Sequence, residues 1–401
     1  MMKAAILGYG TVGSGVYEVL QRNAEVIAEK SGENIEVKYV LDLREFPGDP
    51  VMEVLVHDYE CIVNDPEVRI VVETMGGVKP AYEFVRRALE CGKHVCTSNK
   101  ELVAEYGAEL LALAKERAVN FYFEASVGGG IPIIRPLCEC LTADKILEIS
   151  GILNGTTNYI LTRMYNEGAD FNCVLKGAQE CGYAERNPAA DIEGFDAGRK
   201  LAILASLVLG KRVEFGDVVT EGITGITARD IRYARAMQAK IKLIASAIWK
   251  EESFYALVAP RIIMAGHPLY AIDDVVNAVM VKGNMLGDVL FSGRGAGKLP
   301  TASAVVSDVV QAARHVNENT GLIWSQTRTV PEPVRGMPGR FFVRTDEKNR
   351  QQAKQLFPGL TQVDAGLADE FAFYTEQMTE GEFSERVEEL DKIRNQFRIE
   401  F

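Results

Sequence analysis

Short apolar runs alternate with longer amphipathic stretches in the N-terminal part of the chain. The apolar runs have the length of strands and lie at Ala4–Leu7, Glu36–Leu41, Ile70–Glu73, His94–Cys96 and Asn120–Phe123. Between them, apolar positions recur at helical spacing over Gly13–Ser31, Pro80–Cys91 and Lys100–Arg117. Strands that alternate with helices of crossover length predict a parallel, doubly wound α/β sheet, which we place at residues 1–133.

The pattern changes after Gly128, where a glycine-rich turn leads into a strand at Ile146–Leu153. Long helical segments follow, including Cys173–Cys181 and Asp196–Leu209. This mixture predicts a second domain of the α+β class, at residues 134–325, with its last helix returning to the N-terminal domain.

The C-terminal part begins with the proline-rich stretch Val330–Gly339, which predicts a linker at residues 326–338. A β-α-β-β-α-β order follows in Arg340–Arg344, Arg350–Phe357, Leu360–Val363, Glu370–Tyr374, Glu382–Ile393 and Gln396–Phe401. This is the order of the ferredoxin-like split βαβ unit, expected at residues 339–401. We expect its sheet edges and the apolar strand Phe371–Tyr374 to pair with another subunit.

Charge and cysteine content narrow the choice of partners. The net charge is −12 and no Lys/Arg run is concentrated, which argues against nucleic acid or an anionic membrane as the main partner. No secretory signal opens the chain and no apolar run has the length of a membrane span. The seven cysteines form no paired C-x-x-C set, so reduced thiols in the cytoplasm are expected.

The six residues from Gly8 to Gly13 read G-x-G-x-x-G, directly after a strand and at the start of a helix. Gly8 permits the tight turn, Gly10 lets the backbone approach a pyrophosphate, and Gly13 lets the helix pack on the strand. A strand-to-helix turn of this kind can also bind nothing. Its position at the start of a βαβ array favours a dinucleotide-binding Rossmann domain.

The second strand ends at Asp42 and Arg44, where a dinucleotide's ribose is expected. An acid there accepts the 2′-hydroxyl of NAD, whereas an arginine meets the 2′-phosphate of NADP. Both residue types are present, so NAD and NADP remain open, as does a simple solvated pair.

Two further segments carry candidate chemistry in the first domain. Lys100 follows Thr97-Ser98-Asn99 at the end of a strand, where ligands bind in open α/β sheets, although a lysine there can simply begin a helix. Gly128–Gly130 follow Glu124, and such a loop can turn carbonyl oxygens inward to hold a monovalent cation. The alternative for this loop is an interdomain hinge.

The segment Gly182–Lys200 concentrates acids around one lysine. Asp196 and Lys200 are four residues apart and share a helix face, a spacing that most often means a surface ion pair. Glu185 and Asp191 add acids before the apolar stretch Leu201–Leu209. Crowded acids suit a substrate with an ammonium group, and a partly desolvated lysine suits proton transfer.

Six motifs together resemble the homoserine dehydrogenase family. They stand in the family's order: GYGTVGSG, SNKELVA, FEASVGGGIPIIRPL, GILNGTTNYILTRM, GYAERNPAADIEGFDAGRK and GRGAGKLPTASAVVSD. The resemblance implies NAD(P)-dependent interconversion of L-homoserine and L-aspartate 4-semialdehyde in threonine and methionine biosynthesis. It also implies a substrate-binding and dimerisation role for the second domain, in a homodimer or homotetramer. We expect a monofunctional member, without the aspartate kinase domain fused to some relatives.

The resemblance also implies roles for individual residues. Lys200 would be the proton donor with Lys100 close by, and a buried Glu185 would hold the substrate's amino group. The other expected substrate residues are Asp196, Asp191, Tyr183 and Thr157. The expected cofactor residues are Gly8, Gly10, Thr11, Val12, Gly13, Arg44, Gly76, Ser98, Lys100, Gly182 and Gly295. A sodium ion would lie at Glu124, Val127, Gly129 and Ile131.

Some features depart from the family's pattern or leave other classes open. Asn187 stands where the family often has Asp, and Leu41 stands where members that prefer NADP often have Arg. The C-terminal part resembles an ACT domain in topology, but Asp346–Asn349 lacks the Pro and Gly of the usual ligand loop, so a structural or oligomer-forming role is expected. Rival classes are another semialdehyde dehydrogenase, which would need a catalytic cysteine, and a non-catalytic NAD(P) sensor.

Overall fold

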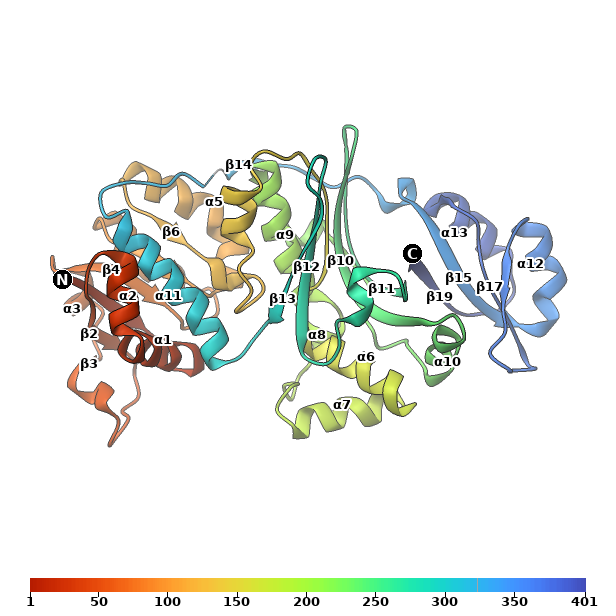
Figure 1. Cartoon of the computed structure of the whole chain (residues 1–401), viewed down its shortest axis with the longest axis horizontal. Helices are drawn as coiled ribbons and strands as arrows, with labels where there is room; N and C mark the ends of the chain where they lie inside the picture. The colour runs from red at the N-terminus through yellow and green to blue at the C-terminus, as the bar shows by residue number, and fades with distance from the viewer. Residues whose placement is uncertain (323) are drawn as a thin grey trace. The chain divides into compact units, whose positions relative to one another are not determined.

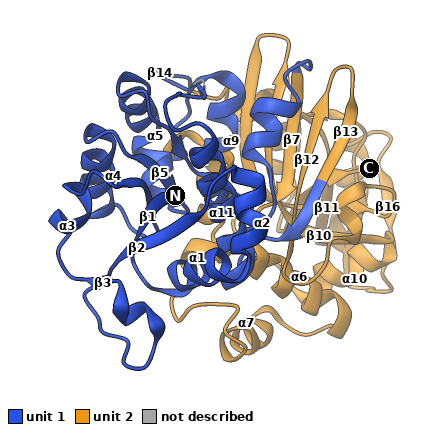
Figure 2. Ribbon diagram, turned by 60° about the vertical axis from the view of Figure 1, so that its left-hand side comes forward, with its two compact units in different colours: residues 1–145, 202–215, 291–329 blue, residues 146–201, 216–290, 330–401 orange. Residues whose placement is uncertain are grey.

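The computed structural model describes residues 1–322 and 324–401. The chain forms two compact units, coloured in Figure 2. Unit 1 comprises residues 1–145, 202–215 and 291–329, and unit 2 comprises residues 146–201, 216–290 and 330–401. This division differs from the four consecutive ranges expected from the sequence, because each unit is assembled from separate stretches of chain.

Unit 1 contains a parallel sheet in the strand order β3-β2-β1-β4-β5-β6. Its strands are β1 (Met2–Leu7), β2 (Ile35–Leu41), β3 (Leu55–Val56), β4 (Val68–Glu73), β5 (His94–Thr97) and β6 (Phe121–Tyr122). The order reverses between β1 and β4, so the predicted doubly wound sheet is confirmed. The short β3 was not predicted.

The helices of unit 1 are α1 (Thr11–Arg22), α2 (Ala24–Ser31), α3 (Glu60–Val63), α4 (Ala81–Glu90), α5 (Lys100–Glu116) and α11 (Lys298–Arg314). The stretch Gly13–Ser31, predicted as one helix, breaks at Asn23, whose N–H donates to the Val19 carbonyl as α1 ends. Figure 1 shows α11 beside α1. An added Cβ on Gly15 of α1 would lie 2.8 Å from the Lys298 carbonyl oxygen, so this glycine permits the close packing.

A sheet of eleven strands belongs mainly to unit 2. Its strand order is β13-β12-β7-β10-β11-β19-β15-β17-β16, with β9 paired to β11 and β18 paired to β15. Its central strands are β7 (Ile146–Ile152), β9 (Val219–Thr220), β10 (Ala239–Lys250), β11 (Ser253–Met264), β12 (Val276–Gly283) and β13 (Gly287–Arg294). The helices of this part are α6 (Gly155–Glu167), α7 (Phe171–Glu180), α8 (Ala189–Ile192) and α10 (Ala228–Ala236). Helix α9 (Phe195–Leu209) begins in unit 2 and ends in unit 1, where β8 (Lys211–Arg212) pairs with β14 (Ser325–Arg328).

The C-terminal module has the predicted β-α-β-β-α-β order. Its elements are β15 (Pro338–Asp346), α12 (Arg350–Leu356), β16 (Thr361–Val363), β17 (Glu370–Tyr374), β18 (Met378–Thr379), α13 (Glu380–Glu388) and β19 (Ile393–Glu400). The strand order β19-β15-β17-β16 is that of a ferredoxin-like sheet. Helix α13 begins two residues earlier than predicted because Thr379 and Glu382 form a capping box, and it ends before Ile393, which pairs with Thr345.

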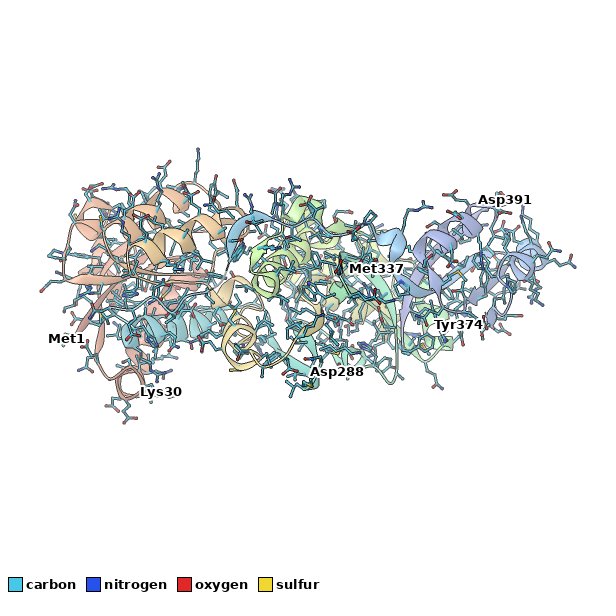
Figure 3. The ribbon with its side chains drawn as sticks, turned by 90° about the horizontal axis from the view of Figure 1, so that it is seen from above. Met1, Lys30, Asp288, Met337, Tyr374 and Asp391 are labelled. Atoms are coloured by element: carbon cyan, nitrogen blue, oxygen red, sulfur yellow. The ribbon has the colours of Figure 1, made fainter. Side chains whose placement is uncertain are left out.

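The prediction that the apolar strand Phe371–Tyr374 pairs with another subunit is wrong. Strand β17 lies between β15 and β16, and Phe371, Ala372 and Phe373 are at most 1% exposed, so this strand offers no edge to another subunit. Strand β19 pairs with β11 of the same chain, because Arg398–Glu400 continue the sheet from Arg261–Ile263. The end of the expected linker is also packed, since Met337, labelled in Figure 3, contacts Leu257 and Ala259.

No helix in the described part of the chain has the length and apolar character needed to cross a membrane.

Candidate active site

The glycine loop of unit 1 has the geometry that its sequence predicts. Gly8 has φ +94°, in the region that favours glycine, and its N–H donates to the Leu41 carbonyl over 2.8 Å. An added Cβ on Gly13 would lie 1.9 Å from the Gly8 carbonyl oxygen, whereas one on Gly10 would meet no atom of the described residues within 4 Å beyond its two chain neighbours. The first and third glycines therefore close the turn, and the second leaves an open approach to the start of α1, where Thr11 and Val12 lie.

A cavity of about 490 Å³ adjoins this loop in unit 1. It is lined by Gly8, Gly10, Leu41, Asp42, Leu43, Arg44, His57, Tyr59, Thr74, Met75, Pro80 and Phe84. Among them, Gly8 and Gly10 follow the carboxyl end of β1, Asp42 and Arg44 follow that of β2, and Thr74 follows that of β4, where a doubly wound sheet binds its ligand. The cavity is large enough for part of a dinucleotide.

Asp42 and Arg44 form a two-pronged ion pair at this cavity. Arg44 Nε donates to Asp42 Oδ1 over 3.0 Å and Nη2 donates to Oδ2 over 2.9 Å. The Tyr9 N–H donates to the same Oδ2 over 2.8 Å. The Arg44 guanidinium holds the pKa of the Asp42 carboxyl well below its usual range. The Asp42 side chain is 9% exposed and the Arg44 side chain 63%, so the arginine is the more accessible partner.

A buried network joins the ends of β4 and β5, and the sequence reasoning missed it. Glu73 Oε1 accepts the N–H groups of Met75 and Gly76 over 2.7 and 3.3 Å, and Oε2 accepts the Thr97 hydroxyl over 2.5 Å. Asn99 caps α5 and donates to the Gly77 carbonyl over 2.6 Å. Burial raises the pKa of the Glu73 carboxyl. The network fixes the loop that carries Gly76.

Ser98 and Lys100 lie just after the end of β5, as predicted. Asn99 accepts the Leu102 N–H over 3.1 Å, and Lys100 is the first residue of α5. The sequence did contain one signal for the network at Glu73: this acidic residue ends the buried, mainly apolar strand β4.

The loop after Glu124 meets the segment of Gly295 within unit 1. The Gly130 N–H donates to the Arg294 carbonyl over 3.0 Å, and an added Cβ on Gly129 would lie 2.2 Å from the Gly295 carbonyl oxygen. Gly128 and Gly129 have φ +75° and +57°. The structure therefore brings the expected cation loop and the expected cofactor residue Gly295 together.

The Glu124 carboxylate itself is occupied by protein donors. Oε1 accepts the N–H groups of Ile133 and Ile134 over 2.6 and 2.7 Å, and Oε2 accepts the Arg135 N–H over 2.9 Å. The Glu124 N–H donates to Asp308 Oδ2 over 2.8 Å, and burial raises the pKa of the Asp308 carboxyl well above its usual value. Within the described residues, no three His, Cys, Asp or Glu side chains gather as metal ligands. A cation at Val127, Gly129 and Ile131 would therefore depend on backbone carbonyl oxygens.

Lys200 lies at the centre of a buried polar cluster in unit 2. Its Nζ donates to Asp196 Oδ2 over 2.7 Å and to the Leu153 carbonyl over 2.8 Å. Asn154 Nδ2 donates to Asp196 Oδ2 over 2.9 Å and to Asp191 Oδ1 over 2.7 Å. Lys200 is 8% exposed and Asp196 3%, so the alternative of a surface ion pair is wrong.

Two members of the cluster show how it is assembled. Burial raises the pKa of the Asp191 carboxyl, although Asn154 donates to it. Asn154 was not among the predicted site residues. It caps α6 by accepting the Thr157 N–H over 2.9 Å, and the buried Thr157 hydroxyl also bonds to it. An Asn directly before a helical pattern was the signal that could have identified it.

The loop between α7 and α8 places Gly182, Tyr183 and Glu185 on the exposed surface of unit 2. The Tyr183 ring lies 4.8 Å from that of Tyr159, and its carbonyl accepts the Thr156 hydroxyl over 2.8 Å. The expectation that Glu185 is buried is wrong, because the residue lies on an exposed loop of the described chain. The structure thus joins Lys200, Asp196, Asp191 and Thr157, and leaves Glu185 outside their hydrogen-bonded network.

A dinucleotide-binding sheet and a buried lysine–carboxylate pair define the class, an NAD(P)-dependent oxidoreductase. The family model for the homoserine dehydrogenase NAD binding domain matches residues 8–124, and the model for homoserine dehydrogenase matches residues 132–310. The homoserine dehydrogenase of Synechocystis sp. is 48% identical over 322 residues, which cover 77% of this chain and 72% of that protein.

Solved structures of homoserine dehydrogenases resemble this chain as well. A homoserine dehydrogenase from Thiobacillus denitrificans superposes with a TM-score of 0.89 at 36% identity, covering 100% of this chain and 98% of that one. A hyperthermophilic archaeal homoserine dehydrogenase in complex with NADPH has a TM-score of 0.63 at 29% identity, covering 78% of this chain and 97% of that one. This chain belongs to the homoserine dehydrogenase family. The activity and the fold class predicted from the sequence are thereby confirmed.

Proposed function

We propose that Lys200 is the acid–base group in the interconversion of L-homoserine and L-aspartate 4-semialdehyde. The observation that carries the proposal is the buried Lys200 Nζ, held 2.7 Å from Asp196 Oδ2 and 2.8 Å from the Leu153 carbonyl. Within the described residues, these contacts use two of the three ammonium N–H donors. The third is available to a substrate oxygen.

The reaction needs one hydride and one proton. A bound nicotinamide supplies or accepts the hydride. In reduction, Lys200 Nζ gives a proton to the aldehyde oxygen, and in oxidation it takes the proton from the hydroxyl. Asp196 orients the ammonium group and Asn154 fixes the Asp196 carboxylate, so both act on the proton-transfer geometry. Asp191, Thr157 and Tyr183 complete the proposed substrate site, with Glu185 on the exposed loop as the partner of the amino group.

The proposed cofactor is NAD(H) or NADP(H), bound at the glycine loop. The ribose end would lie at Asp42 and Arg44, and the nicotinamide half near Gly76, Ser98 and Lys100, with Gly182 and Gly295 as further contacts. Both Asp42 oxygens already accept protein N–H donors, and the exposed Arg44 can turn toward a 2′-phosphate. The NADPH complex of the archaeal relative supports NADP(H) as one of the two.

A sodium ion is the proposed second ligand. Glycines at positive φ in the loop after Glu124 fit a cradle of backbone carbonyls at Glu124, Val127, Gly129 and Ile131, and oxygen donors are what a hard cation prefers. The ion would hold this loop against Gly295.

The remaining assignments concern organisation. We propose a Rossmann domain at residues 1–133, a substrate and dimerisation domain at 134–325, a linker at 326–338 and an ACT-like module at 339–401 that is structural and does not sense threonine. The proposed protein is a cytoplasmic homodimer or homotetramer of threonine and methionine biosynthesis.

Initial rates of L-aspartate 4-semialdehyde reduction with NADPH and NADH in parallel test the proposal, with L-homoserine identified as product. We expect turnover with at least one cofactor. Binding of NADPH without turnover would instead indicate a sensor. Formation of L-aspartate 4-phosphate from the semialdehyde in a parallel assay with NADP⁺ and inorganic phosphate would indicate a semialdehyde dehydrogenase that uses a cysteine.

A further inference from the structure

Arg398 of the C-terminal module is linked to the lysine cluster by a short series of contacts along the eleven-stranded sheet. We propose that Arg398 is a positioning residue: through Glu221 it fixes the segment that carries Asp191 and leads into Asp196 and Lys200. This inference rests on the proposed role of Lys200 and extends it to the C-terminal module.

The first step is the ion pair between Arg398 and Glu221. Arg398 Nη1 donates to Glu221 Oε2 and Nη2 to Oε1, both over 2.9 Å, which is the parallel two-bond geometry that gives directional strength. A second carboxylate also holds Arg398: its Nε donates to Glu380 Oε2 over 2.9 Å at the start of α13. The Arg398 side chain is 14% exposed and that of Glu380 13%, so the contact between these two side chains is shielded from solvent.

The second step is the backbone on either side of Glu221. Its N–H donates to the Val258 carbonyl over 2.8 Å, directly after β9 pairs with Leu257–Val258 of β11. Strand β11 in turn pairs with β19 at Arg261 and Arg398. Glu221 is therefore held to β11 by its backbone and to β19 by its side chain.

The third step is the contact between Gly222 and the segment before α9. The Ile223 N–H donates to the Ile192 carbonyl over 2.8 Å. An added Cβ on Gly222 would lie 2.6 Å from that carbonyl oxygen and 2.9 Å from Glu193 Cα, so the two backbones touch with no room for a side chain. A displacement of Glu221 is thus transmitted to Ile192 and Glu193.

The last step leads to the lysine. Asp191 precedes Ile192 and accepts the Asn154 side chain, which also donates to Asp196 Oδ2. Asp196 Oδ2 accepts Lys200 Nζ. Because proton transfer depends on sub-ångström placement, movement of Ile192 reaches the catalytic geometry without touching the dinucleotide loop.

The experiment compares Arg398→Gln, Glu221→Gln and the double variant in the full-length chain. Each single variant should lower kcat/KM for L-homoserine about tenfold, a loss expected from small misplacement of reacting groups. The double variant should be no less active than the less active single variant, because both single variants remove the same Arg398–Glu221 pair. The pH profile of kcat should shift in all three, and the Kd for NADPH should stay at the wild-type value.

Arg394→Gln is the matched control. Arg394 also lies on β19 and also pairs with a carboxylate, with Nη2 2.7 Å from Asp346 Oδ1, but this pair stays inside the C-terminal module. It should lose less thermal stability than Arg398→Gln, because the Arg394 side chain is 51% exposed, and it should keep both kcat/KM and the pH profile. The Glu221 side chain is 45% exposed, so Glu221→Gln should fold. This variant therefore still tests the pair if Arg398→Gln fails to fold.

Wild-type kcat/KM in Glu221→Gln, additive losses in the double variant, or an equal loss in Arg394→Gln would each overturn the proposal. These outcomes differ from failure of the lysine assignment, which Lys200→Met reports independently: the Glu221–Arg398 coupling remains measurable in kcat/KM whichever group moves the proton.

Discussion

The dinucleotide loop and the lysine cluster are built in opposite ways. The loop consists of six consecutive residues, and its glycines act through backbone geometry alone, at Gly8 and Gly13 most directly. The lysine cluster is made of side chains from Asn154, Asp191, Asp196 and Lys200, joined by hydrogen bonds across three helices and a strand end. One site is local in sequence and the other is tertiary.

The difference predicts how each site fails. A backbone site tolerates changes of nearby side chains but not an added Cβ, whereas a side-chain network loses function when one polar group is removed. Changes in the cluster should therefore lower turnover and leave cofactor binding intact, and changes in the loop should do the reverse.

Lys200→Met should give the largest effect. The variant keeps a side chain of similar length without the ammonium group, so kcat should fall about 10²–10⁴-fold, the usual contribution of one acid–base group. The Kd for NADPH, measured by fluorescence titration, should stay unchanged because Lys200 belongs to the cluster. Near-wild-type turnover in the purified variant would remove Lys200 from its proposed role.

Gly13→Ala should impair the dinucleotide loop. The new Cβ would lie 1.9 Å from the Gly8 carbonyl oxygen, so α1 must shift away from the turn. We expect a stability loss of about 1–3 kcal/mol, typical of overpacking, and a Kd for NADPH raised by more than tenfold. Thermal unfolding and cofactor titration measure both. Gly10→Ala is the control for stability, since in the part of the chain that the structure describes its Cβ would lie more than 4 Å from every atom beyond its two chain neighbours. Equal stability losses in the two variants would contradict this reading of the loop.

Arg44→Ala should change the choice between NADPH and NADH at the cofactor site. Removing the guanidinium frees the Asp42 carboxylate for a ribose hydroxyl and removes the candidate partner of a 2′-phosphate. The ratio of kcat/KM for NADPH to that for NADH should fall about tenfold, as expected for the loss of one charge-assisted contact. An unchanged ratio would place cofactor discrimination elsewhere.

Glu185→Gln should give the smallest effect. Because Glu185 is exposed, its pairing with a substrate ammonium group is screened, and we expect the KM for L-homoserine to rise about fivefold. The KM for the cofactor should not change. Gln179→Ala, which removes only the donor to the Glu185 carbonyl, serves as a control for loop position. Equal increases in both KM values would argue against an amino-group contact.

Much of the fold was predictable because its signals are local. The strands of unit 1 and the order of the C-terminal module follow from apolar periodicity, and the errors lie at boundaries set by caps, such as Asn23 and Thr379. The misassigned edge strand has a different cause. An apolar strand shows that β17 is buried on its faces, but not which strands lie beside it.

The dinucleotide loop, the family and the pairing of Asp196 with Lys200 could be predicted from the sequence, because each depends on residues that are close in the chain or on ordered motifs. Three features became visible in the folded chain: Asn154 joins Asp191 to Asp196, Glu185 is exposed, and β19 extends the sheet from β11. The physical reason is that hydrogen bonds and ion pairs form between groups that are close in space. Periodicity gives the face of a helix or strand, and it contains no information about which distant face it will meet.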